Sequence, residues 1–230
     1  MKVLYYAISD CGKIRKENQD RYVVPQEGTT YLVSEITELP SVFAVFDGMG
    51  GEEFGGDAAQ IAIDTFKQVP DHNNCDLKRI NHIINNALCR YMSENNIDRM
   101  GTTSAFLKIK EETAVACNVG DSSIYKISGN KIFRLSMSHS MKIGTKRVLT
   151  QHLGIPEKEM VLEPYGCRCS LEKDDIFLLC TDGLTDMVEE KRIFEILIKN
   201  EFEKIGQLLL CEALENGGKD NITIILCKIV

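Results

Sequence analysis

The sequence lacks the long apolar segments that mark membrane proteins, and it has no internal repeat or Pro- or Ser-rich linker. We therefore expect no membrane association. The first nine residues form a short strand-like stretch that Asp10 follows at once, which is unlike a signal peptide. A chain of 230 residues, 43% of them hydrophobic, is enough for one large globular domain or two small ones.

Positive charge is also in short supply. The 27 Lys and Arg residues are outnumbered by 34 Asp and Glu residues, for a net charge of −7. This balance argues against nucleic acid as a main partner, because a phosphate backbone needs a basic face. A phosphorylated substrate stays possible, because bound metal ions supply local positive charge.

The nine cysteines lack the paired spacing of a zinc site. Cys117, Cys180 and Cys227 lie inside apolar runs and are expected to be small buried side chains. Cys167 and Cys169 form a lone C-x-C. We interpret all nine as reduced thiols, which favours a cytoplasmic location.

Three aspartates stand where apolar runs begin or end. Asp47 and Asp182 follow such runs, whereas Asp220 precedes one. In an antiparallel sheet the end of one strand lies beside the start of its neighbour, so the three carboxylates can share one rim. Carboxylates at one place repel unless a cation joins them, and this pattern therefore indicates hard metal ions with oxygen ligands.

Glycine follows two of these aspartates and lets the backbone approach a ligand, so the Gly48 carbonyl is a further candidate metal ligand. Asp121 adds a fourth acid between two apparent strands. Each of these residues has a simpler interpretation as a turn or helix-capping residue, since Asp and Gly dominate turns.

Apolar periodicity predicts an order of strands, two helices, strands, two helices and a final strand. Polar turns between the strands favour antiparallel hairpins. The segment 136–150 is ambiguous. Strands are predicted near 2–9, 20–25, 30–34, 41–46, 102–109, 113–119, 122–127, 131–135, 160–169, 175–180 and 222–229, and helices near 52–67, 77–95, 189–199 and 201–216.

Six short segments in this order resemble the metal-dependent serine/threonine protein phosphatases of the PPM (type 2C) family, bacterial branch. They span nearly the whole chain and are specific together, although each is weak alone. They are Arg15–Asp20 (with Asn18-Gln19-Asp20), Val45–Gly51, Met100–Thr103, Val119–Ser122, Thr181–Leu184 and Asp220-Asn221.

The resemblance implies an α+β fold in four layers, αββα, with two antiparallel sheets flanked by helix pairs. It also implies that residues 1–230 form a single phosphatase domain. A dinuclear Mn²⁺ or Mg²⁺ centre is expected at one end of the sandwich, with a third and looser metal ion nearby.

The resemblance also assigns roles to individual residues. Asp47 would bridge the two metals, with the Gly48 carbonyl on one of them. Asp182 and Asp220 would bind the other metal, and Asp20 would act directly or through water. Asp121 would hold the third metal together with Asp182.

Arg15 matches the arginine that binds the substrate phosphate. A guanidinium suits that role because it offers two parallel N–H donors to phosphoryl oxygens. Without its match to the family, Arg15 would be interpreted as a solvated surface charge.

The chain departs from the family at two places. Some members have His directly after Asp-Gly as a proposed general acid, whereas this chain has Met49. The flap segment between Ser138 and Gly154 is much shortened, which leaves substrate preference open. His139, in that segment, is interpreted as a structural loop residue.

The predicted function is hydrolysis of phosphoserine and phosphothreonine on proteins by a metal-activated water, opposing a bacterial Ser/Thr kinase. We expect a monomer whose partners are phosphorylated proteins. The alternatives are a phosphatase-like binding or regulatory module without turnover, and a phosphatase of small phosphorylated metabolites.

Overall fold

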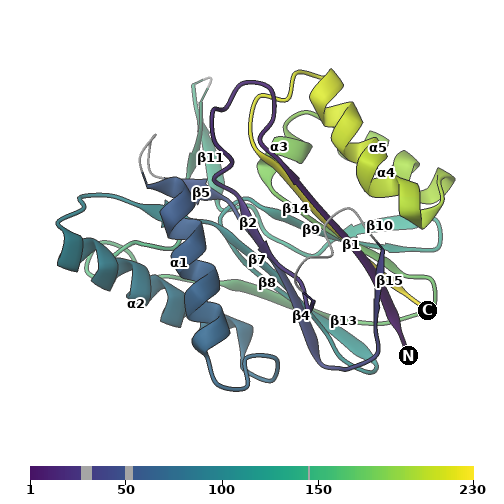
Figure 1. Ribbon diagram of the computed structural model, residues 1–230, viewed down its shortest axis with the longest axis horizontal. Coiled ribbons are helices and arrows are strands. Elements are labelled where there is room, and N and C mark those ends of the chain that lie inside the picture. The colour runs from purple at the N-terminus through teal and green to yellow at the C-terminus, as the bar shows by residue number, and fades with distance from the viewer. Residues whose placement is uncertain (27–32, 50–53, 145) are drawn as a thin grey trace.

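The computed structural model describes residues 1–26, 33–49, 54–144 and 146–230. Within these ranges the chain forms two antiparallel sheets packed face to face, with helices on both outer sides (Figure 1). The predicted α+β fold with four αββα layers is therefore confirmed. No helix in the described ranges is long and apolar enough to cross a membrane.

The first sheet has the strand order β10-β9-β14-β15-β1-β3. Its members are β1 (Val3–Asp10), β3 (Ser34–Ile36), β9 (Ser123–Ser128), β10 (Lys131–Arg134), β14 (Ile176–Cys180) and β15 (Ile222–Ile229). The second sheet has the order β13-β8-β7-β4-β2. Its members are β2 (Arg21–Val23), β4 (Ser41–Phe46), β7 (Ser104–Ile109), β8 (Thr113–Val119) and β13 (Tyr165–Ser170).

Two helices cover each outer face, and a short third helix adjoins the first sheet. They are α1 (Gly55–Gln68) and α2 (Leu77–Asn95) on the second sheet, and α3 (Asp182–Thr185), α4 (Glu190–Lys199) and α5 (Phe202–Glu215) on the first. Two small strand pairs complete the fold: β5 (Gly48–Met49) with β6 (Gly101–Thr102), and β11 (Ser140–Ile143) with β12 (Lys146–Leu149).

Two predicted strands needed correction. The strand expected at 160–169 begins only at Tyr165, because the preceding proline has no N–H to donate to a ladder. The strand at 20–25 stops at Val23, two residues before Pro25, for the same reason. The ambiguous segment 136–150 contains the β11–β12 hairpin. Parts of the predicted strand 30–34 and of the start of the first helix fall on residues 30–32 and 52–53, outside the described ranges.

The ends of α2 show how local sequence sets an element. The Asp76 side chain accepts a hydrogen bond from the backbone N–H of Lys78 and caps the N-terminus. Asn96 ends the helix in the left-handed conformation. Between these caps, Ile80, Ile84 and Leu88 are fully buried at a spacing of four residues, so one face of the helix packs on the sheet.

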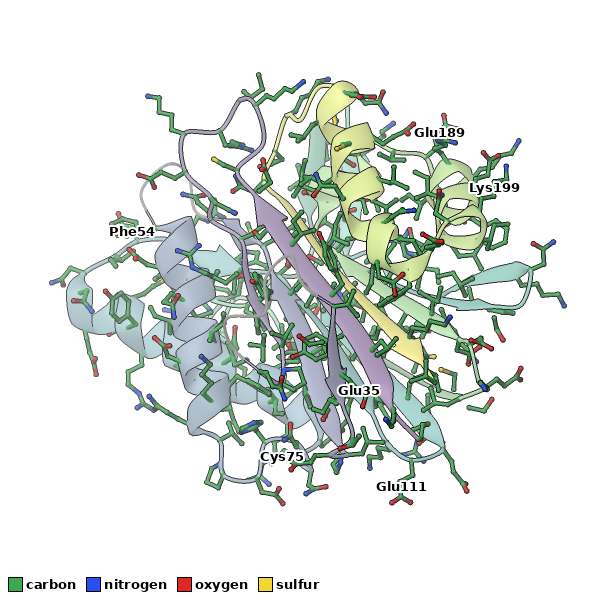
Figure 2. All side chains as sticks on the ribbon, turned by 45° about the vertical axis from the view of Figure 1, so that its right-hand side comes forward. Glu35, Phe54, Cys75, Glu111, Glu189 and Lys199 are labelled. Atoms are coloured by element: carbon green, nitrogen blue, oxygen red, sulfur yellow. The ribbon has the colours of Figure 1, made fainter. Side chains whose placement is uncertain are left out.

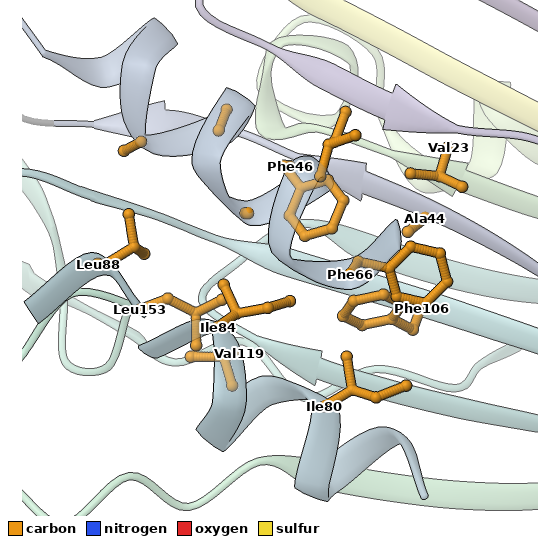
Figure 3. Close-up of a cluster of buried hydrophobic side chains, with 14 of the residues drawn as sticks. Val23, Ala44, Phe46, Phe66, Ile80, Ile84, Leu88, Phe106, Val119 and Leu153 are labelled. Atoms are coloured by element: carbon orange, nitrogen blue, oxygen red, sulfur yellow. The ribbon is translucent and has the colours of Figure 1, made fainter. Parts of the chain in front are cut away.

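Three apolar clusters separate the four layers. One lies between the sheets, one under α4 and α5, and one under α1 and α2. In the last, Phe106 is fully buried and its ring centroid lies 5.4 Å from that of Phe46 and 5.6 Å from that of Phe66 (Figure 3). The contacts between these rings hold α1 against β7, the central strand of the second sheet. They thereby position the N-terminus of α1.

Replacing Phe106 by Ala should lower the free energy of unfolding by about 3–5 kcal/mol, because it leaves a cavity that the rigid sheet cannot fill. Urea denaturation followed by circular dichroism measures this loss. The matched control is Phe133→Ala on β10, whose side chain is 46% exposed and should cost far less. Equal losses for the two variants would contradict this account of the core.

Candidate metal and phosphate site

Strand ends of the first sheet carry three acids to one rim. Cys180 at the end of β14 pairs with Ser123 at the start of β9, and β15 begins at the same edge. Asp182, Asp121 and Asp220 lie two residues beyond these strand ends. The far end of the sandwich is marked in Figure 2 by Glu111, in the turn between β7 and β8.

The second sheet brings two further acids to the same rim. Arg21 at the start of β2 pairs with Phe46 at the end of β4. Asp20 immediately precedes β2 and Asp47 immediately follows β4, so they flank this pair. The rim thus receives five carboxylates from both sheets.

The five carboxylates act on one another electrostatically. Burial raises the pKa of Asp47 well above its ordinary value, and the charges of the other four acids raise it further. Burial, followed by the charge of Asp121, raises the pKa of Asp182 to about 7. Such a set of oxygen donors lacks positive charge, which is the condition that a hard divalent cation relieves.

Asp20 is held by two hydroxyl groups. Burial raises its pKa to about 7, although hydrogen bonds from Thr223 and Thr181 lower it. The hydroxyls of Thr181 and Thr223 both donate to Oδ2 of Asp20, at 2.8 and 2.7 Å. These bonds fix the orientation of the carboxylate. We did not predict the two threonines as site residues, although Thr181 begins one of the six segments that resemble the family.

The backbone of Asp47 is held by the segment at β6. Its N–H donates to the Thr103 hydroxyl at 3.1 Å, and its carbonyl accepts from the Thr103 N–H and the Thr102 hydroxyl, both at 2.9 Å. The Met100–Thr103 segment therefore positions the backbone of Asp47 through Thr102 and Thr103.

Gly48 lies where no side chain fits, because an added Cβ would stand 2.1 Å from the Gly55 carbonyl oxygen. Its carbonyl oxygen in turn lies close to the start of α1. Residues 50 and 51 of the predicted motif fall outside the described ranges.

Arg15 lies beside these acids in the loop between β1 and β2. Its Nη2 donates to Oδ2 of Asp220 at 2.7 Å, and this bond is the main reason that the pKa of Arg15 is raised. The Arg15 side chain is 55% exposed, so its guanidinium keeps N–H donors that face solvent. The structure therefore brings the predicted phosphate ligand and a predicted metal ligand into direct contact.

The amide of Asn221 ties this loop to the start of β15. Its Oδ1 accepts from the Gln19 N–H at 2.8 Å, and its Nδ2 donates to the carbonyls of Cys11 and Glu17, both at 2.9 Å. The Lys13 N–H adds a bond to the Gly218 carbonyl at 2.7 Å. The loop that carries Arg15 is thus held beside Asp220 by hydrogen bonds to the backbone of the loop.

Among the described residues, no three His, Cys, Asp or Glu side chains already converge as a ready metal-binding group. The acids surround the rim instead, with Asp220 turned to Arg15 and Asp20 turned to two hydroxyls. The donor set still fits Mg²⁺ or Mn²⁺, because it is all oxygen, largely buried and strongly self-repelling.

Acids from both sheets at one rim of this fold are the arrangement expected of a metal-dependent phosphatase. The sequence profile described as protein phosphatase 2C matches residues 18–215. The chain belongs to this family, and the predicted class of enzyme, a protein-serine/threonine phosphatase, is confirmed.

Individual relatives are similar in sequence to this chain over most of its length. It is 28% identical to the serine/threonine phosphatase stp of Listeria welshimeri, covering 96% of this chain and 93% of that protein. It is also 28% identical to the phosphatase PhpP of Streptococcus pneumoniae, covering 95% and 94%.

The solved structure of PstP from Mycobacterium tuberculosis has the same fold, with a TM-score of 0.83, 22% identity and coverage of 100% and 99%. The PstP catalytic domain solved in complex with two manganese ions gives a TM-score of 0.80, at 23% identity and full coverage of both chains.

The raised pKa of Asp20 sets a pH dependence for the metal-free protein. An unfolded Asp has a pKa of about 4, whereas burial raises the pKa of folded Asp20 to about 7. The folded state binds the extra proton in this window, so the contribution of Asp20 to stability is lost as pH rises from 4 to 7. In chelator, Asp20→Asn should therefore gain stability relative to the unmodified protein with rising pH.

Urea unfolding at several pH values measures this difference, and comparing variants cancels the opposite titration of the buried histidines His139 and His152, whose pKa values burial lowers. The exposed Asp98→Asn is the control and should track the unmodified protein at every pH. A gap between Asp20→Asn and the unmodified protein that does not change with pH would disprove the prediction.

Proposed function

We propose that residues 1–230 act as a single domain that hydrolyses phosphoserine and phosphothreonine on proteins with the help of divalent metal ions. The observation that carries this proposal is the rim of five mutually repelling acids with Arg15 directly beside it. The acids account for metal binding, and the exposed guanidinium accounts for recognition of a phosphoryl group.

The donor positions suggest a division of labour. Asp47, on which the charges of all four other acids act, would bridge two Mn²⁺ or Mg²⁺ ions, with the Gly48 carbonyl on one. Asp182 and Asp220 would bind the other, and Asp20 would bind directly or through water. Asp121 with Asp182 would hold a third ion. The two manganese ions in the PstP complex support such a centre here.

Bound ions would lower the pKa of a water molecule and offset the charge of the phosphoryl group. The chain's own residues then have three tasks. Asp47, fixed by Thr102 and Thr103, holds the centre of the site in place. Asp20, fixed by two threonine hydroxyls, holds its edge.

Arg15 performs the third task, orienting the phosphoryl group through N–H donors that Asp220 does not use. Because one end of its guanidinium is already held, Arg15 loses less side-chain freedom when substrate binds.

The family origin supports phosphorylated proteins as substrates, and a kinase of Ser/Thr type is the natural source of such groups. All nine cysteines are free thiols, as expected for a cytoplasmic protein. The cytoplasmic location, the opposing kinase and the monomeric state stay predictions.

Turnover of phosphoserine and phosphothreonine peptides should require Mn²⁺ or Mg²⁺, and chelator should abolish it. Asp47→Asn and Asp220→Asn should each remove activity, because they delete a metal-binding oxygen. Phosphate release is the measurement, with Asp98→Asn as the surface control. Full activity in excess chelator would refute the proposal.

The same assay separates the alternatives. Binding of Mn²⁺ and phosphopeptide without hydrolysis would identify a regulatory binding module. A strong preference for small phosphoesters over phosphopeptides would identify a metabolite phosphatase.

Met49 occupies the position where some relatives have a His that protonates the leaving alkoxide, and it pairs with Gly101 at the rim. We expect that metal-bound water or solvent provides that proton here, or that the substrate tolerates poor acid catalysis. Met49→His should therefore change the acid limb of the pH–rate profile for kcat, because it adds a group with a pKa of about 6.5. An unchanged limb would argue that leaving-group protonation does not limit the rate.

A further inference from the structure

His139 lies at the junction between the acidic rim and the β11–β12 hairpin. Its ring is buried, 5% exposed, and its backbone N–H donates to the Gly120 carbonyl at 2.9 Å. In return the Gly120 N–H donates to Nδ1 of His139 at 3.1 Å. Two reciprocal bonds therefore join this histidine to the residue directly before Asp121.

These contacts set the tautomer of the ring. A nitrogen that accepts a backbone N–H carries no proton, so neutral His139 has its proton on Nε2. Nε2 is buried and has no hydrogen-bond partner among the described residues. Burying the Nε2–H donor without a partner costs free energy. The ring nevertheless keeps the orientation in which Nδ1 accepts the hydrogen bond from Gly120.

Asn118 strengthens the same junction. Its buried amide donates to the carbonyls of Met137 at 2.7 Å and Gly120 at 3.2 Å, and its Oδ1 accepts from the Met137 N–H at 3.0 Å. The segment that leads into the hairpin is thus fastened to the Asp121 turn at residues 137 and 139.

The turn is also fastened to the centre of the site. Gly120 has φ of +97°, and an added Cβ would lie 2.6 Å from Cγ2 of Thr103. Thr103 bonds the backbone of Asp47 and the hydroxyl of Ser122. The path from Asp47 to the hairpin therefore consists of short, buried contacts.

The hairpin projects beyond the sheets directly after His139 (Figure 1). The Thr150 N–H closes its base on the His139 carbonyl at 2.8 Å. Met141 stands opposite Val148 in the register, and both are about half exposed, as is Ile143. These half-exposed apolar side chains offer a surface that a polypeptide can contact.

We propose that His139 is a positioning residue that locks the Asp121 turn and the base of the hairpin into one arrangement, so that metal binding at Asp121 and contact of a phosphopeptide with the hairpin depend on each other. This inference rests on the proposed function in placing a metal at Asp121. A residue acting only in overall stability would not link these two events.

Two substitutions test the geometry. In His139→Asn the Oδ1 atom lies as far from Cβ as Nδ1 does in histidine, so the Gly120 N–H keeps its acceptor. In His139→Gln the polar atoms lie one bond further out, and that acceptor is misplaced. Circular dichroism and thermal unfolding check that both variants fold.

Calorimetric titration with Mn²⁺ is the first measurement, and Asp121→Asn identifies the binding component that depends on Asp121. His139→Gln should weaken that component by about tenfold or more, as is typical of lost ligand support, whereas His139→Asn should stay close to the unmodified protein. Absence of any Asp121-dependent component, or equal affinities in both variants, would overturn the inference.

Kinetics provide the second measurement. His139→Gln should lower kcat/KM for a phosphopeptide by more than for p-nitrophenyl phosphate, which has no polypeptide chain to contact the hairpin. Equal losses on both substrates would overturn the coupling. If the unmodified protein hydrolyses neither substrate, the proposed function fails, while calorimetry still tests the role of His139.

Nitrogen NMR of the imidazole gives a readout independent of turnover and of metal. The His139 signals, assigned by their loss in His139→Asn, should show the proton on Nε2. A proton on Nδ1 would contradict the bond from Gly120 and overturn the inference.

Discussion

Repulsion between buried carboxylates is the constraint on which the rest of this structure depends. Asp47 feels the charges of four other acids in a largely buried setting, where unpaired charge is costly. The rim of five carboxylates keeps its folded arrangement only if protons or cations reduce its charge. The surrounding scaffold must also prevent the side chains from turning away from one another. The surrounding contacts serve this second need: two threonine hydroxyls hold Asp20, and three hydrogen bonds with Thr102 and Thr103 hold the backbone of Asp47.

The scaffold meets this need by joining chain ends that are far apart in sequence. β1 and β15 pair along their whole length, which brings the loop after β1 to the start of β15. The Asn221 amide then satisfies three backbone groups of that loop. Arg15 is positioned through this contact, and its own exposed bond to Asp220 adds little to stability. The geometry of the proposed phosphate ligand is therefore a consequence of sheet pairing and of one buried amide.

The sheets and the four long helices could be predicted from the sequence, because their apolar residues recur with the period of a strand or a helix. The five acids could be predicted because Asp or Asp-Gly beside an apolar run indicates an oxygen ligand at a strand end. The supporting residues were not predicted. Thr181, Thr223 and Asn118 are ordinary strand or turn residues until the fold brings their partners, more than fifteen positions away, into contact. The β11–β12 hairpin was missed because most of its described side chains are exposed, so it has no buried face to produce a periodic pattern.

The β11–β12 hairpin lies in the segment where the sequence predicts a much shortened flap. Here the base is fixed by reciprocal bonds between His139 and Gly120 and by the amide of Asn118, all of them buried. Motion of the hairpin therefore requires motion of the turn that carries Asp121, and the charge on that turn is part of the repulsion at the rim. A cation that relieves this repulsion and a contact that moves the hairpin therefore act on the same joined segment.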